Sequence, residues 1–535
     1  MASPVTLLTW LLAFSPIAVV LVLMMGLRWG GDRAGAAGWV VAMSVAWLRF
    51  GAGWEVLLAS QLRGLLLSLY VLYIIWMALV LYRVVDEAGA IAVIGQGMVR
   101  LTAEPTMQLL LLAWAFGAFL QGVSGYGVPI AVVAPLLIGL GFKPVVAVAA
   151  VAIGHSWSVT FGSIAASFQA LMASSGLPGH DLAPWSAAFL GVACFGCGIA
   201  AAWIFQGWRA VQQGGPALLL MGTAMAGVQA LLATSGLWNL AGFGAGLAGL
   251  AVGALVARLP RYQSSTAEVV LRKAADGIGL AESVDTHRPR MKLRLALIPY
   301  LLLVVVVATV ELWPWLNDAL NRIEIWVDLP QVITSYGWVT AAGPGRTTSV
   351  FGHAGALLAY VSVVTFLLYR QTGHYTPGAI RRVAKATFRS AVPSSIGILT
   401  MVGLAVAMDH SGMVHILARG LGAAAGPVYP LVAPFIGLLG AFMTGSNTNS
   451  NVVFTPLQQQ AAQVLHISAL TILGAQTTGG AVGSALAPAK LIVGCSTAGL
   501  VGQEGKVLKA ILLPGLIIIG AVGLLALAAV SLRAR

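Results

Sequence analysis

Charged side chains are scarce in this sequence. Of its 535 residues, 8% are Asp, Glu, Lys or Arg, whereas 59% are hydrophobic, and the mean hydropathy is +0.92. Soluble globular domains contain about 25% charged residues, so the composition excludes that class of protein. Apolar runs of roughly 18 residues or more recur along the chain, and each is long enough to cross a bilayer as a helix. We therefore expect an integral membrane protein.

Several other functional classes lack their usual residues. The three cysteines are too few for a disulfide framework, and we interpret the CxxC pair, Cys194 and Cys197, as packing thiols in an apolar helix. The sequence has no motif that binds a nucleotide or a metal or that supplies a nucleophile. Its eight histidines are scattered rather than clustered, which disfavours a membrane-embedded enzyme. We therefore expect neither enzymatic activity nor a cofactor.

A bundle of helices is the expected fold. Helices satisfy their own backbone hydrogen bonds in lipid, and no stretch alternates as a membrane β-barrel would. The apolar runs predict an all-α polytopic membrane protein with roughly 12–14 transmembrane segments, the second of them at about residues 37–57. The first run, residues 7–26, lacks a basic leader and a small-residue cleavage site, so we expect a retained helix rather than a signal peptide.

Basic residues are grouped in short loops. The net charge is +13, and clusters of Lys and Arg lie within residues 28–33, 258–294 and 370–389. This positive-inside distribution predicts that these loops are cytoplasmic and that the acidic stretch 311–328 lies outside. The lipid bilayer therefore explains the charge, and we expect no nucleic acid partner.

The two halves of the chain share a pattern of residues. Asp86 and Asp409 lie 323 positions apart, and so do Phe119 and Phe442, within the matching stretches FLQG and FMTG. This shared offset predicts an internal repeat. Because the helix ending near Arg83 is predicted to run inward and its partner outward, we expect the two repeats to be inverted in the membrane. Inverted repeats are typical of secondary transporters, whose binding site lies near the midplane between them.

Each half carries an interruption at the corresponding position. In the second half, residues 446–451 are SNTNSN, six consecutive Ser, Asn or Thr between apolar segments, and VSGYGVP at 123–129 takes this position in the first half. Polar, non-helical backbone at membrane depth is tolerated only where it is buried in protein or lines a cavity. We predict that both stretches are tips of re-entrant hairpins, where helix N-termini bind an anion and side-chain oxygens bind a cation or a hydroxyl.

These patterns together predict the domain organisation. We expect N-terminal transmembrane helices at 1–58, a first repeat at 59–255 with a hairpin near 117–142, a cytoplasmic loop at 256–292, connecting helices and an external loop at 293–380, and a second repeat at 381–535 with a hairpin near 431–465.

The interrupted stretches resemble those of the L-lactate permease family of bacterial transporters. The resemblance is carried by GAFLQGVSGYGVPIAVVAPLLIGLGFKP at 117–144, by the VTFGS that follows, and by FMTGSNTNSN, TTGG and GLVGQEG within 442–505. It implies a secondary carrier of lactate or glycolate, usually proton-coupled, in the bacterial inner membrane. The family is similar in turn to dicarboxylate/sodium symporters, which implies an elevator-type movement and a homodimer.

Several positions depart from the family pattern. Gln121 and Asn447 stand where family members tend to carry a glutamate and an aspartate, and neither amide can exchange a proton at physiological pH. His155 and Lys490 are departures that add hydrogen-bond donors or positive charge beside the expected site. Either both act on the anion, or Lys490 snorkels to an interface and His155 hydrogen-bonds a helix carbonyl.

The favoured function is secondary active transport of a small organic anion by ion symport, most simply of a 2-hydroxymonocarboxylate such as L-lactate or glycolate. Alternatives are a carrier for a sulfonate or dicarboxylate, sodium-coupled or exchanging, and, less favoured, a channel or a membrane enzyme. The coupling ion stays open between a proton carried by His155, or less readily by Asp409, and sodium at Ser446, Asn447 and Thr448. The predicted substrate- and ion-binding residues lie at the two tips and in the segments that follow them: Gln121, Ser124, Gly125, Tyr126, Gly127, His155, Ser156, Ser163, Ser446, Asn447, Thr448, Asn449, Asn451, Thr477, Thr478, Gly479, Ser484 and Lys490.

Overall fold

The structure is a computed structural model that describes residues 6–27, 29–99, 101–125, 127–263 and 291–533. Tyr126, one of the predicted site residues, lies outside the described residues, and so does most of the predicted cytoplasmic loop at 256–292.

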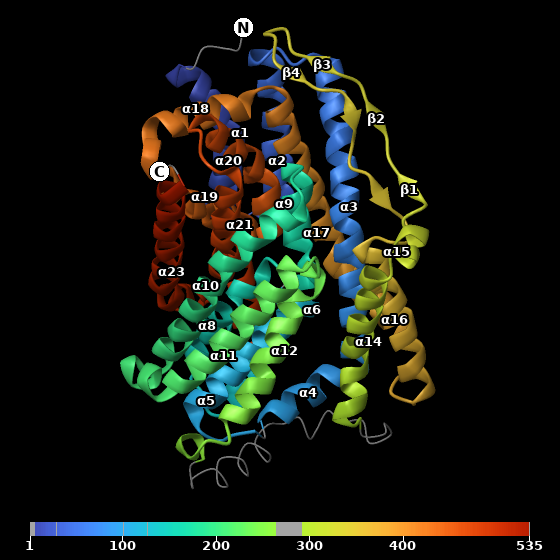
Figure 1. The fold of residues 1–535 in the computed structure, drawn as a ribbon, viewed down its shortest axis with the longest axis vertical. Helices are drawn as coiled ribbons and strands as arrows, with labels where there is room; N and C mark the ends of the chain where they lie inside the picture. The colour runs from blue at the N-terminus through green and yellow to red at the C-terminus, as the bar shows by residue number, and fades with distance from the viewer. Residues whose placement is uncertain (1–5, 28, 100, 126, 264–290, 534–535) are drawn as a thin grey trace.

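Helices account for nearly all of the described regular structure (Figure 1). The first half contains α1 (Leu7–Met25), α2 (Gly31–Arg49), α3 (Trp54–Glu87), α4 (Ala90–Val99), α5 (Pro105–Leu109), the π-helix η1 (Leu110–Phe116), α6 (Gly117–Val123), α7 (Val128–Gly139), α8 (Pro144–Gly154), the 3-10 helix η2 (Ser156–Val159), α9 (Gly162–Ser175), α10 (Gly179–Gln206), α11 (Trp208–Thr234), α12 (Trp238–Val256) and the 3-10 helix η3 (Pro260–Tyr262). The second half contains α14 (Leu293–Leu312), α15 (Pro314–Leu320), α16 (Ala354–Gln371), α17 (Ala379–His410), α18 (Met413–Ala425), the 3-10 helix η5 (Gly426–Val428), α19 (Tyr429–Thr444), α20 (Asn447–Val464), α21 (Ala469–Leu486), α22 (Pro488–Thr497) and α23 (Glu504–Arg533).

The number of candidate membrane spans lies at or just below the lower limit of the predicted 12–14. Among the described residues, 11 helices are long and apolar enough to cross a bilayer, or 12 if the bent pair α21 and α22 counts as one span. The predicted range reaches this value only at its lower limit, because apolar segments such as α7 and α8 are too short to span alone. The predicted second helix is also wrong in its bounds. It begins at Gly31 and ends at Arg49, and the chain then turns at Gly51, whose φ is 65°.

The two halves follow a similar order of elements. In each, a long helix (α3 or α17) is followed by a glycine with a φ of 80°, Gly89 or Gly412, and by a short helix, α4 or α18. A helical hairpin comes next, then a broken helix, and then another long helix, α10 or α23. The short helices α4 and α18 lie at opposite ends of the molecule (Figure 1). This arrangement places one helical hairpin toward each end of the molecule.

Residues 323–350 form an antiparallel hairpin that the all-α prediction did not include. Its short strands pair in three steps: β1 (Glu324–Ile325) with β6 (Thr348–Ser349), β2 (Asp328–Leu329) with β5 (Gly343–Pro344), and β3 (Val332–Ile333) with β4 (Val339–Thr340). The hairpin runs along α3 to the upper end of the molecule (Figure 1). There the N–H of Ser335 donates to the carbonyl of Gly51 at 2.9 Å, which ties the hairpin to the α2–α3 turn.

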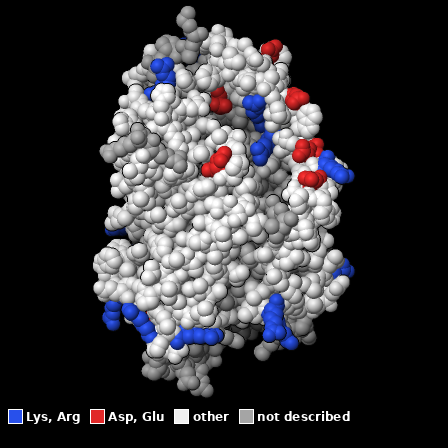
Figure 2. All heavy atoms as spheres, in the orientation of Figure 1, with Lys and Arg blue, Asp and Glu red and all other residues white. Residues whose placement is uncertain are grey.

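Charged side chains are distributed unequally between the two ends (Figure 2). Basic atoms with no visible acidic atoms among them rim the lower end in this view, whereas basic and acidic atoms both lie in the upper half. The lower end is therefore the one that the positive-inside rule assigns to the cytoplasm.

Glycines allow α19 and α21 to pack with their backbones in contact. A Cβ atom on Gly479 would overlap the carbonyl oxygen of Pro434, and one on Gly437 would overlap that of Gln476. Small residues at helix interfaces permit this close approach in membranes. The contact holds the segment that contains Gln476 and Thr477 against the second hairpin.

We expect Gly479→Ala to destabilise the protein by about 1–3 kcal/mol, because overpacking forces the backbones of α19 and α21 apart. Gly520→Ala is the matched control, since a Cβ on this helical glycine of α23 would meet no atom within 4 Å. Thermal unfolding in detergent measures both. Equal melting temperatures for the two variants would contradict the proposed tightness of the α19–α21 contact.

Candidate functional site

Each hairpin turns through glycines in the left-handed region. In the first hairpin, α6 ends at Val123, and Gly125 and Gly127 have φ of 62° and 83° before α7 begins. In the second, α19 ends at Thr444 and Gly445 has a φ of 70°. Only glycine adopts these angles without strain. We call these turns tip 1 (residues 124–127) and tip 2 (residues 445–446).

The stretch SNTNSN is mostly helical, which corrects the prediction of a non-helical polar tip. Ser446 is the N-cap of α20 and its side chain accepts from the N–H of Asn449 at 3.4 Å, while Asn447 to Asn451 form the first helical residues. The reason is that serine before a helical run favours capping over an extended loop. The amide side chains therefore project from a helix, at fixed spacing, near the end that carries partial positive charge.

Both tips lie against α22. A Cβ on Gly445 would be 3.5 Å from the Cβ of Ala489, and one on Gly127 would be 3.7 Å from Cγ1 of Val493. Ala489 and Val493 are four residues apart in a helix, so the two contacts lie about one turn, roughly 5–6 Å, from each other. Lys490 is in the same turn.

Asn451 joins three segments at tip 2. Its Nδ2 donates to the carbonyl of Ser167 at 2.8 Å and to Oγ1 of Thr477 at 2.9 Å, and its Oδ1 accepts from Nε2 of Gln476 at 3.2 Å. Asn451 is fully buried. It therefore links α20 to α9 and α21.

Asn447 and Thr448 make further links to the broken helix α8–η2–α9. Nδ2 of Asn447 donates to Oγ1 of Thr160 at 3.0 Å, and Thr160 donates to the carbonyl of Thr477 at 3.1 Å. The hydroxyls of Thr448 and Ser167 are 3.0 Å apart. The start of α20, the η2–α9 segment and α21 thus form one polar cluster inside an apolar protein.

Four side-chain amide oxygens around the tips have no hydrogen-bond partner among the described residues: Oε1 of Gln121, Oδ1 of Asn447, Oδ1 of Asn449 and Oε1 of Gln476. A buried acceptor without a partner is costly, and native structures contain few of them. All four are neutral carbonyl oxygens, which bind a hard cation or accept from a hydroxyl. The cluster can therefore bind an ion or a hydroxyl-bearing molecule.

Lys490 is buried, so it does not snorkel to an interface. Its side chain is 8% exposed, and Nζ donates to Oγ of Ser484 at 2.9 Å. Among the described residues it makes no ion pair within 4.0 Å. A buried cation in a membrane protein is expensive and marks a functional site by default.

His155 is fully buried at the end of α8. Its Nδ1 bonds the carbonyl of Val151, as one alternative predicted, whereas its Nε2 has no partner among the described residues. The indole Nε1 of the neighbouring Trp157 is also buried without one. His155 lies close enough to Lys490 for an electrostatic interaction. Nε2 of His155 and Nε1 of Trp157 are therefore available to a bound anion or ion.

Tip 1 is held by Gln121 and by a strained turn. Gln121 packs on Gly162, and a Cβ on Gly125 would overlap Oγ of Ser163. Ser163, Ile164 and Ala165 have positive φ of 49°, 54° and 58°. This conformation costs about 1–2 kcal/mol per non-glycine residue, and such strain concentrates at functional sites.

Some predicted residues satisfy their polar groups locally. Ser124 donates to the carbonyl of Leu120, Ser156 to that of Ile153 and Thr478 to that of Gly474. Gly479 packs between helices, as described above. The hydroxyl protons of these three residues are therefore used within their own helices, which leaves the hydroxyl oxygens as acceptors.

The prediction missed Thr160, Ser167 and Gln476. Thr160 belongs to the VTFGS stretch, and Gln476 directly precedes TTGG, so both were within segments already singled out. Ser167 carried no such signal, because it lies outside the segments that had been singled out.

Comparison with known proteins gives the family of the chain. The family model described as L-lactate permease matches residues 9–533. Glycolate permease GlcA of Escherichia coli K12 is 26% identical, covering 97% of this chain and 95% of that protein. The L-lactate permeases of Escherichia coli K12 and Bacillus subtilis 168 are 27% and 26% identical over 89% and 90% of this chain, and 87% and 89% of their own lengths.

Among solved structures, the chain is similar to the YdaH transporter of Alcanivorax borkumensis, with a TM-score of 0.44 and 16% identity, covering 87% of this chain and 86% of that one. The relatives named above are permeases, which are transporters rather than enzymes. With its apolar spans, the chain is a multi-pass protein of the bacterial inner membrane. It belongs to the L-lactate permease family and is a transporter of small hydroxy-acid anions.

Proposed function

We propose that this chain carries a 2-hydroxymonocarboxylate such as L-lactate or glycolate by ion symport, and binds it between the two hairpin tips. The observation that supports this best is a buried cation, Lys490, in the helix that both tips contact. The carboxylate pairs with Nζ, and the 2-hydroxyl donates to an unpartnered amide oxygen such as that of Asn447. A single cation at this position favours a monocarboxylate over a dicarboxylate.

Two groups near the tips are candidates for coupling. Nε2 of His155 is unpartnered and can accept a proton, while the oxygens of Asn447 and Asn449 are of the kind that coordinates sodium. Gln121 and Asn447 cannot themselves carry a proton. Proton symport through His155 is the first candidate, and sodium symport is the second.

We expect an imposed inward proton gradient alone to drive accumulation of L-lactate in proteoliposomes, and His155→Ala to abolish that accumulation. The reason is that the variant removes the proton acceptor and leaves the amide cluster intact. His180→Ala, at an exposed histidine, is the control. Proton-driven accumulation that survives His155→Ala excludes the histidine route, and accumulation under a sodium gradient alone favours the amide oxygens.

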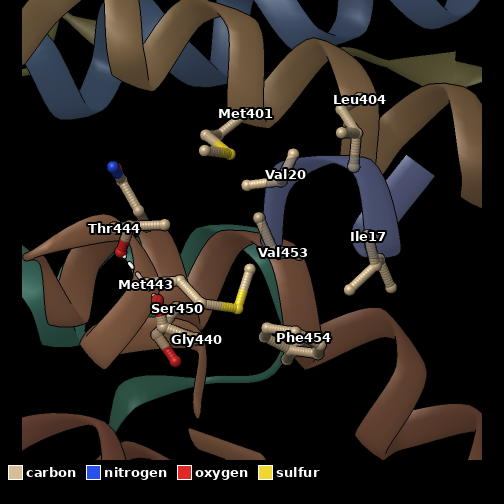
Figure 3. A pocket seen from close by; sticks show the side chains of 11 residues that line it. Ile17, Val20, Met401, Leu404, Gly440, Met443, Thr444, Ser450, Val453 and Phe454 are labelled. Atoms are coloured by element: carbon tan, nitrogen blue, oxygen red, sulfur yellow. Dashed lines mark hydrogen bonds between the residues drawn. The ribbon is translucent and has the colours of Figure 1, made fainter. Parts of the chain in front are cut away.

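An elevator movement is part of the proposal. The second helical hairpin, formed by α19 and α20, contacts α1 and α17 through apolar side chains. These side chains surround a cavity of only about 10 Å³, with Ile17, Val20, Met401 and Leu404 on one side and Met443, Val453 and Phe454 on the other (Figure 3). Apolar contacts without directional bonds allow two bodies to slide past each other. The similar order of elements in the two halves, with α4 and α18 at opposite ends of the molecule, supports the same movement. The homodimer that the resemblance implies stays a prediction.

A further inference from the structure

A second cavity lies next to the antiparallel hairpin of residues 323–350, which we call the outer hairpin. Its volume is about 480 Å³, and it is lined by α3, α9, α17, α20 and residues 341–346. This volume falls within the range of about 300–1,000 Å³ for small-molecule sites. The cavity is therefore large enough for a small carboxylate with bound water.

Two arginines from distant parts of the chain line this cavity, Arg63 of α3 and Arg346 of the outer hairpin. Among the described residues, neither makes an ion pair within 4.0 Å, and Arg346 instead lies 4.2 Å above the ring of Tyr70. Burial, and then the charge of Arg346, lower the pKa of the adjacent His353 to about 4, so this imidazole is neutral at physiological pH. Arg63 lies close enough to Asp409 for an electrostatic interaction, so the two guanidinium groups are only partly neutralised and can still attract an anion.

Three residues that line the cavity also carry polar atoms without partners. Nε of Arg346, Oγ of Ser174 and Nδ1 of His410 are buried, and none has a hydrogen-bond partner among the described residues. Arginine and serine donate hydrogen bonds, and arginine binds carboxylates in a bidentate manner. Asp409 lines the same cavity, so two arginines and one aspartate give a formal net charge of +1. This balance suits a monoanion better than a dianion.

The floor of the cavity adjoins tip 2. It includes Val452 and Pro456 of α20, which follow Asn447 by five and nine residues. At 1.5 Å per residue these positions are about 7–14 Å along the helix from the tip. Val452 is next in sequence to Asn451, the centre of the polar cluster. An anion in the cavity is therefore close to the tips, but it does not contact the turn of α22 that contains Lys490.

We propose that this cavity is an outer capture site, in which Arg63 and Arg346 bind the carboxylate of a small monocarboxylate before it reaches the tips. The identity of the captured anion rests on the proposed function, because it is the anion that the protein carries. A cleft whose net charge has one sign raises the local concentration of the oppositely charged ligand, with an effect that falls with ionic strength. The arginines therefore act on association rather than on translocation.

The test is uptake and binding by the full-length protein. We expect the double variant Arg63→Gln/Arg346→Gln to raise the KM for L-lactate uptake about tenfold at low salt and to remove its salt dependence, since steering contributes about 10–10³ to association rates. The maximal rate should stay within about twofold, because such steering acts on encounter. Arg322→Gln, an exposed arginine before the outer hairpin, is the matched control. An unchanged KM with unchanged salt dependence overturns the proposal.

Binding separates this inference from the proposed function. Equilibrium dialysis with radiolabelled L-lactate should give two sites per chain in the wild type, one lost in the double arginine variant and the other in Lys490→Gln. The variant Arg63→Lys/Arg346→Lys keeps the charge and should retain the first site, which controls for misfolding. If the wild type binds a single L-lactate, and this binding is unchanged in both double arginine variants, the capture site is refuted. If no gradient drives uptake but arginine-dependent binding persists, the transport proposal fails and the capture site stands.

Discussion

Replacing Lys490 with glutamine is expected to weaken L-lactate binding by about 1.5–3 kcal/mol, the range for a hydrogen bond to a charged group, which corresponds to about 10- to 150-fold in affinity. Lys490 is 8% exposed, and among the described residues its ammonium group donates to a neutral serine, Ser484. A buried ammonium without a counter-charge gains most when an anion arrives. The affinity loss should therefore appear in binding as well as in uptake.

Binding of radiolabelled L-lactate to the purified protein measures this effect. Lys506→Gln is the control, because Lys506 is exposed and bonds only Gln503 at 3.0 Å. Removal of a buried charge should also leave thermal stability equal or higher, since the cost of burying the ammonium disappears. An unchanged affinity would contradict the role of Lys490 as a ligand for the anion, and an unchanged affinity with a lowered melting temperature would indicate a structural role instead.

The class of fold was predictable from the sequence because composition and hydropathy are averages over all residues, so no single position decides them. It also located both interruptions, since a run such as SNTNSN has no reason to occur between apolar segments unless it is buried in protein. The bounds of α2 were missed because they depend on a single turn at Gly51 rather than on hydropathy. The outer hairpin was missed because each of its strands is two residues long, which gives no alternating pattern to detect.

The candidate site was only partly predictable for a related reason. Residues in a polar run can be recognised from the sequence, and Asn447 and Asn451 were. Ser167 could not be recognised in this way, because a lone serine in an apolar helix usually bonds its own backbone. Its role depends on contact with Thr448, which lies 281 positions away. Likewise, the sequence left Lys490 open between burial and snorkelling, since the choice depends on the helices packed around it.

Asn451→Leu is expected to abolish L-lactate uptake and to destabilise the protein by about 3 kcal/mol or more, because each buried polar group left unsatisfied costs about 1–3 kcal/mol. The substitution nearly keeps the volume of the side chain but deprives the carbonyl of Ser167, the hydroxyl of Thr477 and the amide of Gln476 of a partner. Gln463→Leu is the control, because Gln463 is an exposed residue of the same helix.

Thermal unfolding and uptake, measured on the same preparation, distinguish two possible roles of the hydrogen bonds made by Asn451. If Asn451 only stabilises the fold, uptake per folded molecule at low temperature should be preserved while the melting temperature falls. If it holds tip 2 in register with α9 and α21, uptake should be lost even where the protein is fully folded. We expect the second result, because the three bonds join α20 to both neighbouring segments, and Asn447 of the same helix carries the unpartnered oxygen assigned to the hydroxyl of the anion. A normal rate of uptake by folded Asn451→Leu would contradict the placement of the site at tip 2.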